Sequence, residues 1–208
     1  MSYGFLDIAV TPSVKAAQSS MGSDKMWTNF KGHREFDRFT QNEAAFIAAR
    51  DSFYMASVSE TGWPYVQHRG GPAGFLKLID PQTLAFPDYR GNRQYITLGN
   101  LSADARVALI LMDYAGHQRL KVYARVEVVP VDADPALTAQ LVIPGYRAVL
   151  ERILMLHLES FDWNCPQHIT SRFTEAEIGV TVAPLRERIV ALEAENETLR
   201  AKLAERGD

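Results

Sequence analysis

The sequence predicts a mainly β fold of the α+β class: a small barrel of six or seven antiparallel strands, flanked by helices and followed by a C-terminal coiled-coil helix. Two observations favour this fold. Short segments rich in aromatic and β-branched residues, separated by Gly and Pro turns, follow one another through the middle of the chain. At the C-terminal end, apolar residues recur at every seventh position.

Composition limits the possible functions. The 208 residues are 47% hydrophobic and 23% charged, which is typical of one globular domain with modest appendages. A net charge of −3 gives no reason to expect binding to nucleic acid or to a membrane. The single cysteine, Cys165, and the lack of a signal-peptide pattern or a long apolar run favour a soluble cytoplasmic protein.

The chain divides into three predicted parts. A short helix near Ser13–Ser20, with Thr11 as its N-cap, is expected before the barrel. A second helix opens the barrel domain, because Thr40 and Glu43 have the spacing of a capping box. The three parts are the lead-in of residues 1–35, the barrel domain of residues 36–173 and the C-terminal helix of residues 174–208.

Seven segments have the pattern of barrel strands. The clearest pair forms a hairpin around the turn Thr61-Gly62. The last segment alternates, so a half-buried strand fits it slightly better than a helix. Between the strands, helices are expected over residues 93–101 and over residues 133–150, the latter with a break at Pro144-Gly145. The candidate strands are Ser52–Ser59, Pro64–Arg69, Phe75–Ile79, Thr83–Phe86, Val107–Met112, Leu120–Pro130 and Arg152–Phe161.

The C-terminal segment carries the heptad pattern of a coiled coil. An Asn at one a position and Leu at the d positions favour a parallel two-stranded coil, because two Asn side chains hydrogen-bond across the seam. Docking of this helix on its own domain is the alternative. The a positions are Val182, Ile189, Asn196 and Leu203, and the d positions are Leu185, Leu192 and Leu199.

Three segments together resemble the pyridoxamine 5′-phosphate oxidase-related family of FMN-binding split barrels. They are Gly62–Lys77, Leu84–Met112 and Phe161–Ile169, and the resemblance extends over residues 40–170. The last segment contains Asp-Trp-Asn-Cys-Pro-Gln-His (DWNCPQH), which is typical of one bacterial subfamily. The resemblance implies an FMN-binding split barrel and a homodimer in which each of two FMN molecules sits between the chains.

The resemblance also implies that basic and polar residues after the second and fourth strands hold the FMN phosphate. Where the family shows Gly-Ser-Arg-Lys, this chain has Gly-Asn-Arg-Gln, so Arg69 or Arg90 is expected to supply the missing charge. A guanidinium with neutral donors suits a phosphate dianion. Exposed loop and strand positions are the alternative reading. The candidates are Gln67, His68, Arg69, Asp88, Arg90, Asn92, Arg93 and Gln94.

A second group of candidates is expected around the flavin ring. Arg119 and Lys121 match a strand where the family places polar residues near the isoalloxazine, and a positive group there stabilises the reduced flavin. The water-exposed face of a strand is the alternative for both. Trp163 and Gln167 fall in the region that lines the cofactor pocket in the family, and a role as a core anchor is the alternative for Trp163.

These residues favour an FMN-dependent oxidoreductase that passes hydride or electrons through flavin N5 to or from a small molecule. The Arg-x-His pair with which the family's oxidases bind substrate is absent from residues 174–208, so pyridoxal phosphate synthesis is not expected. No catalytic residue and no metal-ligand spacing stand out. The alternatives are a non-enzymatic flavin carrier or sensor, and a barrel that binds a deazaflavin or haem, with His68, His157 or His168 as haem ligands.

Overall fold

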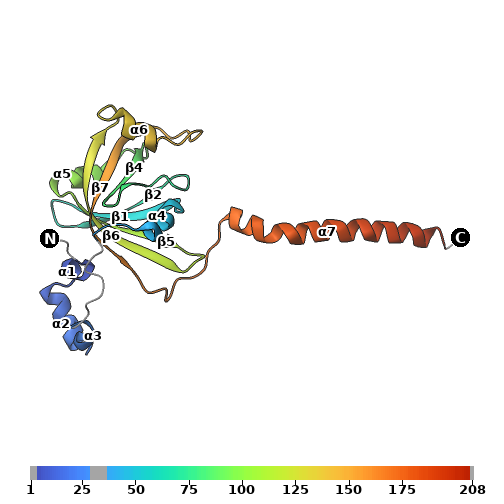
Figure 1. The fold of residues 1–208 in the computed structure, drawn as a ribbon, viewed down its shortest axis with the longest axis horizontal. Helices are drawn as coiled ribbons and strands as arrows, with labels where there is room; N and C mark the ends of the chain where they lie inside the picture. The colour runs from blue at the N-terminus through green and yellow to red at the C-terminus, as the bar shows by residue number, and fades with distance from the viewer. Residues whose placement is uncertain (1–3, 29–36, 207–208) are drawn as a thin grey trace. The chain divides into compact units, whose positions relative to one another are not determined.

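The centre of the computed structural model is one seven-stranded antiparallel sheet, curled into a split barrel (Figure 1). The structure describes residues 4–28 and 37–206. The strand order is β2-β1-β5-β6-β7-β4-β3, which leaves β2 and β3 as the two edges of the sheet. The strands are β1 (Ser52–Val58), β2 (Pro64–Gly70), β3 (Lys77–Asp80), β4 (Thr83–Tyr89), β5 (Arg106–Asp113), β6 (Gln118–Pro130) and β7 (Leu150–Trp163). The predicted mainly β fold class is confirmed.

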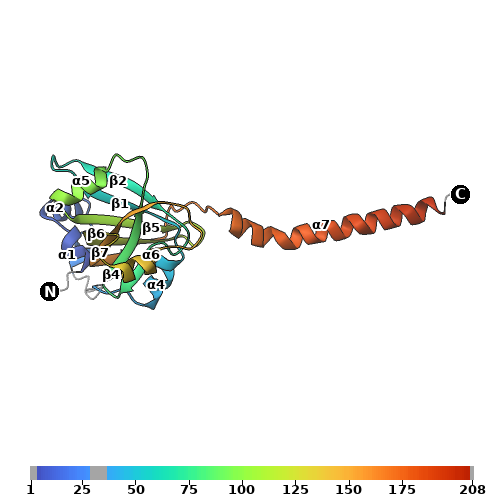
Figure 2. The ribbon, with the colours of Figure 1, turned by 90° about the horizontal axis from the view of Figure 1, so that it is seen from above.

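Four short helices lie against this sheet (Figure 2): α1 beside β7, α4 beside β3, α5 beside β1 and α6 beside β4. The helices are α1 (Phe5–Ala9), α2 (Pro12–Ser20), α3 (Asp24–Thr28), α4 (Gln41–Ala48), α5 (Ile96–Ala103), α6 (Pro135–Leu141) and α7 (Glu175–Ala204). Of the predicted lead-in, residues 1–3 and 29–35 lie outside the described part of the chain.

Both predicted N-caps are present. The hydroxyl of Thr11 accepts from the backbone N–H of Val14 at 3.3 Å at the start of α2. At the start of α4, the backbone N–H of Thr40 donates to Oε2 of Glu43 at 2.9 Å, which completes the capping box. These bonds satisfy donors that a helix terminus otherwise leaves without partners.

Two predicted helices differ from the observed ones. The helix expected over residues 93–101 begins at Ile96, because Arg93 and Tyr95 have φ of 65° and 53°, which a right-handed helix excludes. The helix expected over residues 133–150 ends at Leu141 and is followed by turn and coil up to β7. A residue before proline is pushed out of the helical region, and the Pro144-Gly145 pair lies in that segment.

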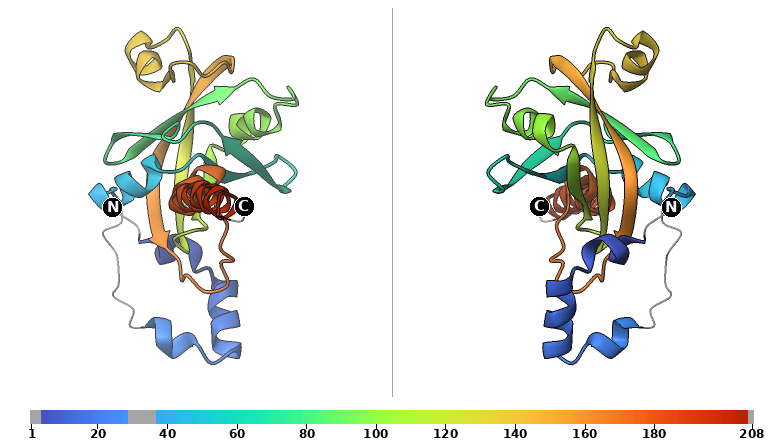
Figure 3. Two further views of the ribbon diagram at one scale, coloured as in Figure 1. Left: turned by 90° about the vertical axis from the view of Figure 1, so that its right-hand side faces the viewer. Right: turned by 90° about the vertical axis from the view of Figure 1, so that its left-hand side faces the viewer.

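The barrel core follows from the two-residue alternation of the strands. On β1, Phe53 and Met55 are buried, whereas Tyr54 faces the outside. The longest pairing joins β6 and β7, which lie side by side in both views of Figure 3. Phe161 of β7 is fully buried and stacks on Phe39 with ring centroids 5.2 Å apart. The sheet therefore has a closed apolar inner face and a separate outer face.

The described chain separates into two units, each with its own internal contacts. One unit holds the residues up to Asp113 together with His117–His168, and it contains the barrel. The other combines Tyr114–Gly116 with the segment from Ile169 onward, and it contains α7. Within residues 4–28 and 37–206, no helix is long and apolar enough to cross a membrane.

Candidate functional site

Two arginines meet on one carboxylate where the free edge of the sheet at β2 approaches β4. Nη1 of Arg69, at the end of β2, lies 2.8 Å from Oδ1 of Asp88 on β4. Nη1 of Arg152, on β7, lies 2.6 Å from Oδ2 of the same carboxylate. The Asp88 side chain is only 9% exposed, and the two arginine side chains are 19% and 17% exposed. We call Arg69, Asp88, Glu151 and Arg152, with their neighbours Arg90 and Tyr95, the seam cluster.

Glu151 connects the seam cluster to the loop after β4. Its Oε1 accepts from Nε of Arg90 at 2.7 Å and from the hydroxyl of Tyr95 at 3.1 Å. Arg90 and Tyr95 flank the predicted Gly91–Gln94 phosphate turn on either side. One carboxylate therefore holds both ends of this turn in place.

The turn itself has a constrained backbone. The side-chain oxygen of Asn92 accepts from the backbone N–H of Gln94 at 3.1 Å. Arg93 occupies the left-handed region, with φ of 65°, and Tyr95 does so as well. All four residues of the turn are exposed in the single chain. Arg93 is thus an exposed residue within a turn whose two flanking residues, Arg90 and Tyr95, both bond to Glu151.

Hydrogen bonds within the seam cluster favour the charged forms of Glu151, Arg90 and Arg152. The hydrogen bond from Arg90 lowers the pKa of Glu151, and the same bond raises the pKa of Arg90. Burial disfavours the charged form of Arg152, but the hydrogen bond and charge of Asp88 outweigh it, so the pKa of Arg152 is raised. The cluster and the adjacent turn contain four guanidinium groups, those of Arg69, Arg90, Arg93 and Arg152. They contain two carboxylates, those of Asp88 and Glu151, so positive charge is in excess.

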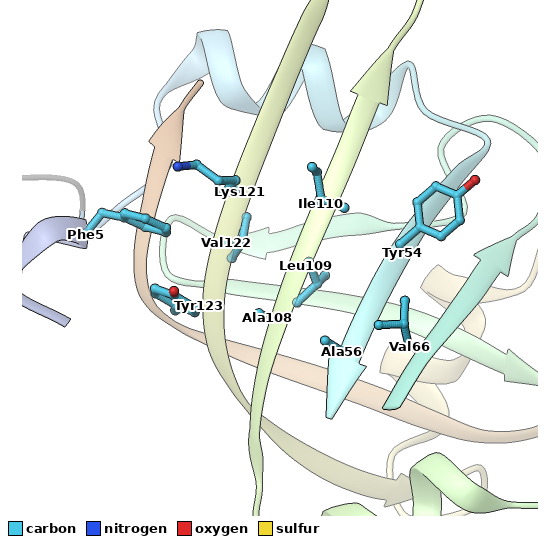
Figure 4. A pocket seen from close by; sticks show the side chains of 10 residues that line it. All are labelled: Phe5, Tyr54, Ala56, Val66, Ala108, Leu109, Ile110, Lys121, Val122 and Tyr123. Atoms are coloured by element: carbon cyan, nitrogen blue, oxygen red, sulfur yellow. The ribbon is translucent and has the colours of Figure 1, made fainter. Parts of the chain in front are cut away.

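A second feature lies on the outer face of the sheet (Figure 4). It is an apolar hollow of about 240 Å³, and Lys121 supplies its one charged side chain. Phe5 of α1 stacks on Tyr123 with ring centroids 4.6 Å apart, and the Lys121 ammonium lies 4.4 Å from the Phe5 ring centroid. The lining residues are Phe5, Tyr54, Ala56, Val66, Ala108, Leu109, Ile110, Lys121, Val122 and Tyr123.

The DWNCPQH motif holds two cations on this outer face. Asp162 and Lys121 are opposite each other in the β6–β7 register, and their charged atoms are 2.8 Å apart. Two positions further on, the amide oxygen of Asn164 accepts from the guanidinium of Arg119. Arg119 and Lys121 are two residues apart on β6, so both project from the same face. Alternate residues of the motif thereby orient both predicted ring-contacting cations.

Trp163, between those two motif residues, points to the other face of the strand. Its indole Nε1–H donates to Oε1 of Glu43 at 2.7 Å, and its ring packs edge-on against Phe46 with centroids 4.7 Å apart. Burial alone would raise the pKa of Glu43, but hydrogen bonds from Thr40 and Trp163 outweigh it and lower that pKa. The contacts of Trp163 are those of an anchor between β7 and α4.

The remaining candidates occupy separate places. Gln67 accepts a hydrogen bond from the Tyr65 hydroxyl at 2.6 Å on the half-buried side of β2. His68 projects from the opposite side of β2, and its ring lies 5.5 Å from that of Tyr54, which lines the hollow. Gln167 is exposed in a turn after β7. His157 is bonded to Glu127 at 3.0 Å, and no three potential metal ligands cluster among the described residues.

Three members of the seam cluster were missed by the sequence analysis: Tyr95, Glu151 and Arg152. Arg152 lies opposite Asp88 in the β4–β7 register, and 64 positions separate the two residues along the chain. The signal that points to it is local: an Arg directly after a Glu at the start of a strand otherwise rich in apolar residues. That pattern is also common at exposed strand ends, so it gains meaning only with the strand pairing.

With this geometry in place, the chain can be assigned to a class, that of split-barrel proteins. The family model described as pyridoxamine 5′-phosphate oxidase matches residues 39–151, which is more than half of the chain. The chain belongs to this family. No curated protein matches it.

Several solved structures are similar to this chain at low sequence identity. HupZ from Group A Streptococcus has a TM-score of 0.50 at 15% identity, over 65% of this chain and 99% of that one. A general stress protein 26-related protein of Clostridium acetobutylicum has a TM-score of 0.45 at 13% identity, over 66% and 94% of the two chains. An FMN-binding protein from Syntrophomonas wolfei has a TM-score of 0.45 at 12% identity, over 74% and 95%. At such identities, the HupZ likeness supports the fold alone.

Proposed function

We propose that this chain is an FMN-binding flavoprotein that works as a homodimer and carries out oxidoreductase chemistry on a small molecule. The observation that carries the proposal is the convergence of Arg69 and Arg152 on Asp88 beside the Gly91–Gln94 turn. Membership of the pyridoxamine 5′-phosphate oxidase family supports a flavin as the ligand.

The seam cluster suits the phosphate end of FMN. Its excess of positive charge attracts a dianion, and guanidinium groups bind phosphate through paired N–H donors. Nε of Arg69 is buried and has no hydrogen-bond partner among the described residues, so the cluster contains one unsatisfied donor. Arg93 on the exposed turn and the amides of Asn92 and Gln94 supply further donors. Arg69 and Arg90 remain the residues proposed to supply the charge that the family's Lys has at the position of Gln94, and Arg152 adds a third guanidinium to the cluster.

The outer face of the sheet suits the flavin ring and the second subunit. Tyr54, Val58 and Val66 are exposed there, and cross-strand pairing places them on one continuous apolar surface. Apolar patches of this kind mark interaction sites on protein surfaces. We propose that a second copy covers this face and that the ring is enclosed between the subunits.

Bound FMN supplies two-electron chemistry at its N5 atom, and the protein supplies position and charge. Arg119 and Lys121, held by Asn164 and Asp162, offer positive charge at the rim of the hollow, which favours an anionic reduced ring. A flavin carrier is the second candidate, and the hollow itself favours it, because Lys121 is the one titratable group there besides two tyrosines. Reduction by NADH or NADPH at a useful rate distinguishes an enzyme from a carrier.

The first test is the absorption spectrum of the purified protein, followed by an FMN titration of the apoprotein. The proposal predicts flavin bands and saturable binding of one FMN per chain. Replacement of Arg93 by Ala is expected to weaken FMN binding about tenfold to a hundredfold, the usual effect of losing a hydrogen bond to a charged group.

The matched control is Arg106→Ala. Arg106 is an exposed arginine that pairs with Asp104 at the start of β5, and its removal changes net charge by the same amount. Arg93→Ala must weaken FMN binding while Arg106→Ala leaves it unchanged. If the two variants bind FMN with equal affinity, Arg93 does not bind the phosphate. If the spectrum shows a Soret band in place of flavin bands, the bound ligand is haem and not FMN.

A further inference from the structure

We propose that α7 pairs with α7 of a second copy of this chain as a parallel, in-register, two-stranded coiled coil, that Asn196 specifies this orientation and that charged residues beside the seam stabilise it. The inference stands independently of the flavin, because it depends only on the helix from Glu175 to Ala204. None of the residues of α7 is buried. A helix of this length in water needs packing of its apolar stripe for most of its stability.

The apolar stripe of α7 is narrow, as a coiled-coil seam requires. The d positions Leu185, Leu192 and Leu199 are all exposed, and so are Ile189 and Leu203 at a positions. Pro184, inside the helix, falls at a c position away from the seam, and the heptads after it run without interruption. The polar a residue, Asn196, pairs with itself in a parallel dimer and specifies that register.

Charge complementarity favours a second, parallel copy. In a parallel pair, each g residue faces the e residue of the next heptad on the partner. Arg188 at g then faces Glu193 at e, and Glu195 at g faces Arg200 at e. Both contacts join opposite charges, and the two-fold symmetry repeats each of them.

The antiparallel alternative is disfavoured by Asn196. In an antiparallel pair, each a residue faces a d residue of the partner, so Asn196 would face a leucine and lose its partner. A polar side chain buried in the seam without a partner selects against this arrangement.

Disulfide trapping in the full chain tests the orientation. Cys165, the single cysteine, is exposed and is replaced by Ser to give a cysteine-free background. Leu199→Cys at a d position near the C-terminal end is expected to form an intermolecular disulfide in a glutathione buffer. Ala201→Cys, at an outward f position two residues away, is the matched control and is expected to crosslink at least about tenfold less.

Charge reversal tests the specificity. Glu195→Arg places a guanidinium opposite that of the partner copy's Arg200 and is expected to reduce Leu199→Cys crosslinking about tenfold at low salt, since two symmetry-related contacts turn from attraction to repulsion. Adding Arg200→Glu restores opposite charges and is expected to restore crosslinking. Glu187→Arg, at an outward f position, makes the same charge change and is the matched control. Neither Glu187 nor Glu195 has a charged neighbour three or four residues away in its own helix. Glu187→Arg is therefore expected to leave crosslinking unchanged.

The inference is overturned if Leu199→Cys and Ala201→Cys crosslink equally, or if neither crosslinks. It is also overturned if Glu195→Arg and Glu187→Arg have the same effect, or if Arg200→Glu fails to rescue Glu195→Arg. None of these readouts uses FMN. If the protein does not bind FMN but the Leu199→Cys variant still forms the intermolecular disulfide, the proposed function alone is refuted. If the protein binds FMN but the Leu199→Cys variant forms no disulfide, the coiled coil alone is refuted.

Discussion

The seam cluster and the outer-face hollow differ in charge and in burial. In the seam cluster, Asp88 and its two arginines are each largely buried, and each charge has a partner within the cluster. In the hollow, the walls are apolar and exposed, and Lys121 is the single charged side chain of the lining. The first feature is complete within one subunit, whereas the second leaves its apolar surface uncovered.

Under the proposed function, this difference divides ligand binding between the two features. A cluster that is already paired internally gains little from a monovalent ion, but its surplus positive charge attracts a dianion such as a phosphate ester. An uncovered apolar face has no charge preference and gains by burying flat apolar surface. The proposed function therefore assigns the phosphate of FMN to the seam cluster and its flat ring to the hollow.

The largest expected effect comes from removing the shared carboxylate. Asp88→Asn leaves Arg69 and Arg152 close together without their counter-charge, and loss of one member of a buried ion pair costs about 3 kcal/mol of unfolding free energy. Urea denaturation measures this loss. Inorganic phosphate should restore more stability to the variant than it adds to the unchanged protein, because it supplies the missing negative charge.

Asp104→Asn is the control for that measurement. Asp104 also pairs with an arginine, Arg106, but that pair is exposed, and Arg106 holds the pKa of Asp104 at about 2. Exposed pairs contribute little to stability, so this variant should unfold close to the unchanged midpoint. If Asp88→Asn and Asp104→Asn lower the unfolding free energy equally, the seam cluster is no more stabilising than an exposed ion pair.

The next largest effect tests the hollow as a subunit interface. Val66 is 60% exposed in the single chain, so Val66→Asp should leave the fold stable. In a Leu192→Asp background, which disables α7, it should raise the dissociation constant of the dimer at least about a hundredfold, because an interfacial charge would be buried without a partner. Sedimentation velocity measures the change.

Val128→Asp in the same background is the control. Val128 is 38% exposed on β6 and does not line the hollow. The dimer should survive this variant. If Val66→Asp leaves the dimer intact too, the subunits meet on another face.

The smallest expected effect comes from Trp163, whose contacts lie outside both features. Trp163→Phe removes the indole donor to Glu43 and should cost about 1 kcal/mol at neutral pH, with FMN affinity unchanged. The folded-state pKa of Glu43 is lowered, so its stabilisation is present above the unfolded pKa and is lost as the pH falls through the folded value. The cost of Trp163→Phe should therefore shrink on acidification. A drop in FMN affinity would move Trp163 into the binding site.

The sequence predicted what depends on neighbours along the chain. The capping box of Thr40 and Glu43 spans three residues, and the alternation that identified β7 is equally local. The family segments also led to Arg69 and Arg93, because those positions follow recognisable strands. Local spacing and turn chemistry were sufficient for the strands and for most of the helix starts.

The rest depended on pairing between distant segments. The bond from Arg152 to Asp88 requires the β4–β7 register, and no local pattern encodes it. The two faces of the DWNCPQH motif, with Asp162 and Asn164 toward the cations and Trp163 toward α4, likewise follow from the register of β6 with β7. The late start of α5 reflects the left-handed backbone at Arg93 and Tyr95, which neither residue type favours on its own.

The backbone of Arg93 has one further consequence. A glycine would adopt φ of 65° without penalty, whereas a residue with a Cβ is disfavoured there by about 1 kcal/mol. The chain nevertheless has a long cationic side chain at this exposed turn, despite the energetic cost. Under the proposed function, thermal stability favours glycine at position 93 and phosphate binding favours arginine, so selection for heat resistance alone would replace Arg93 and weaken FMN binding.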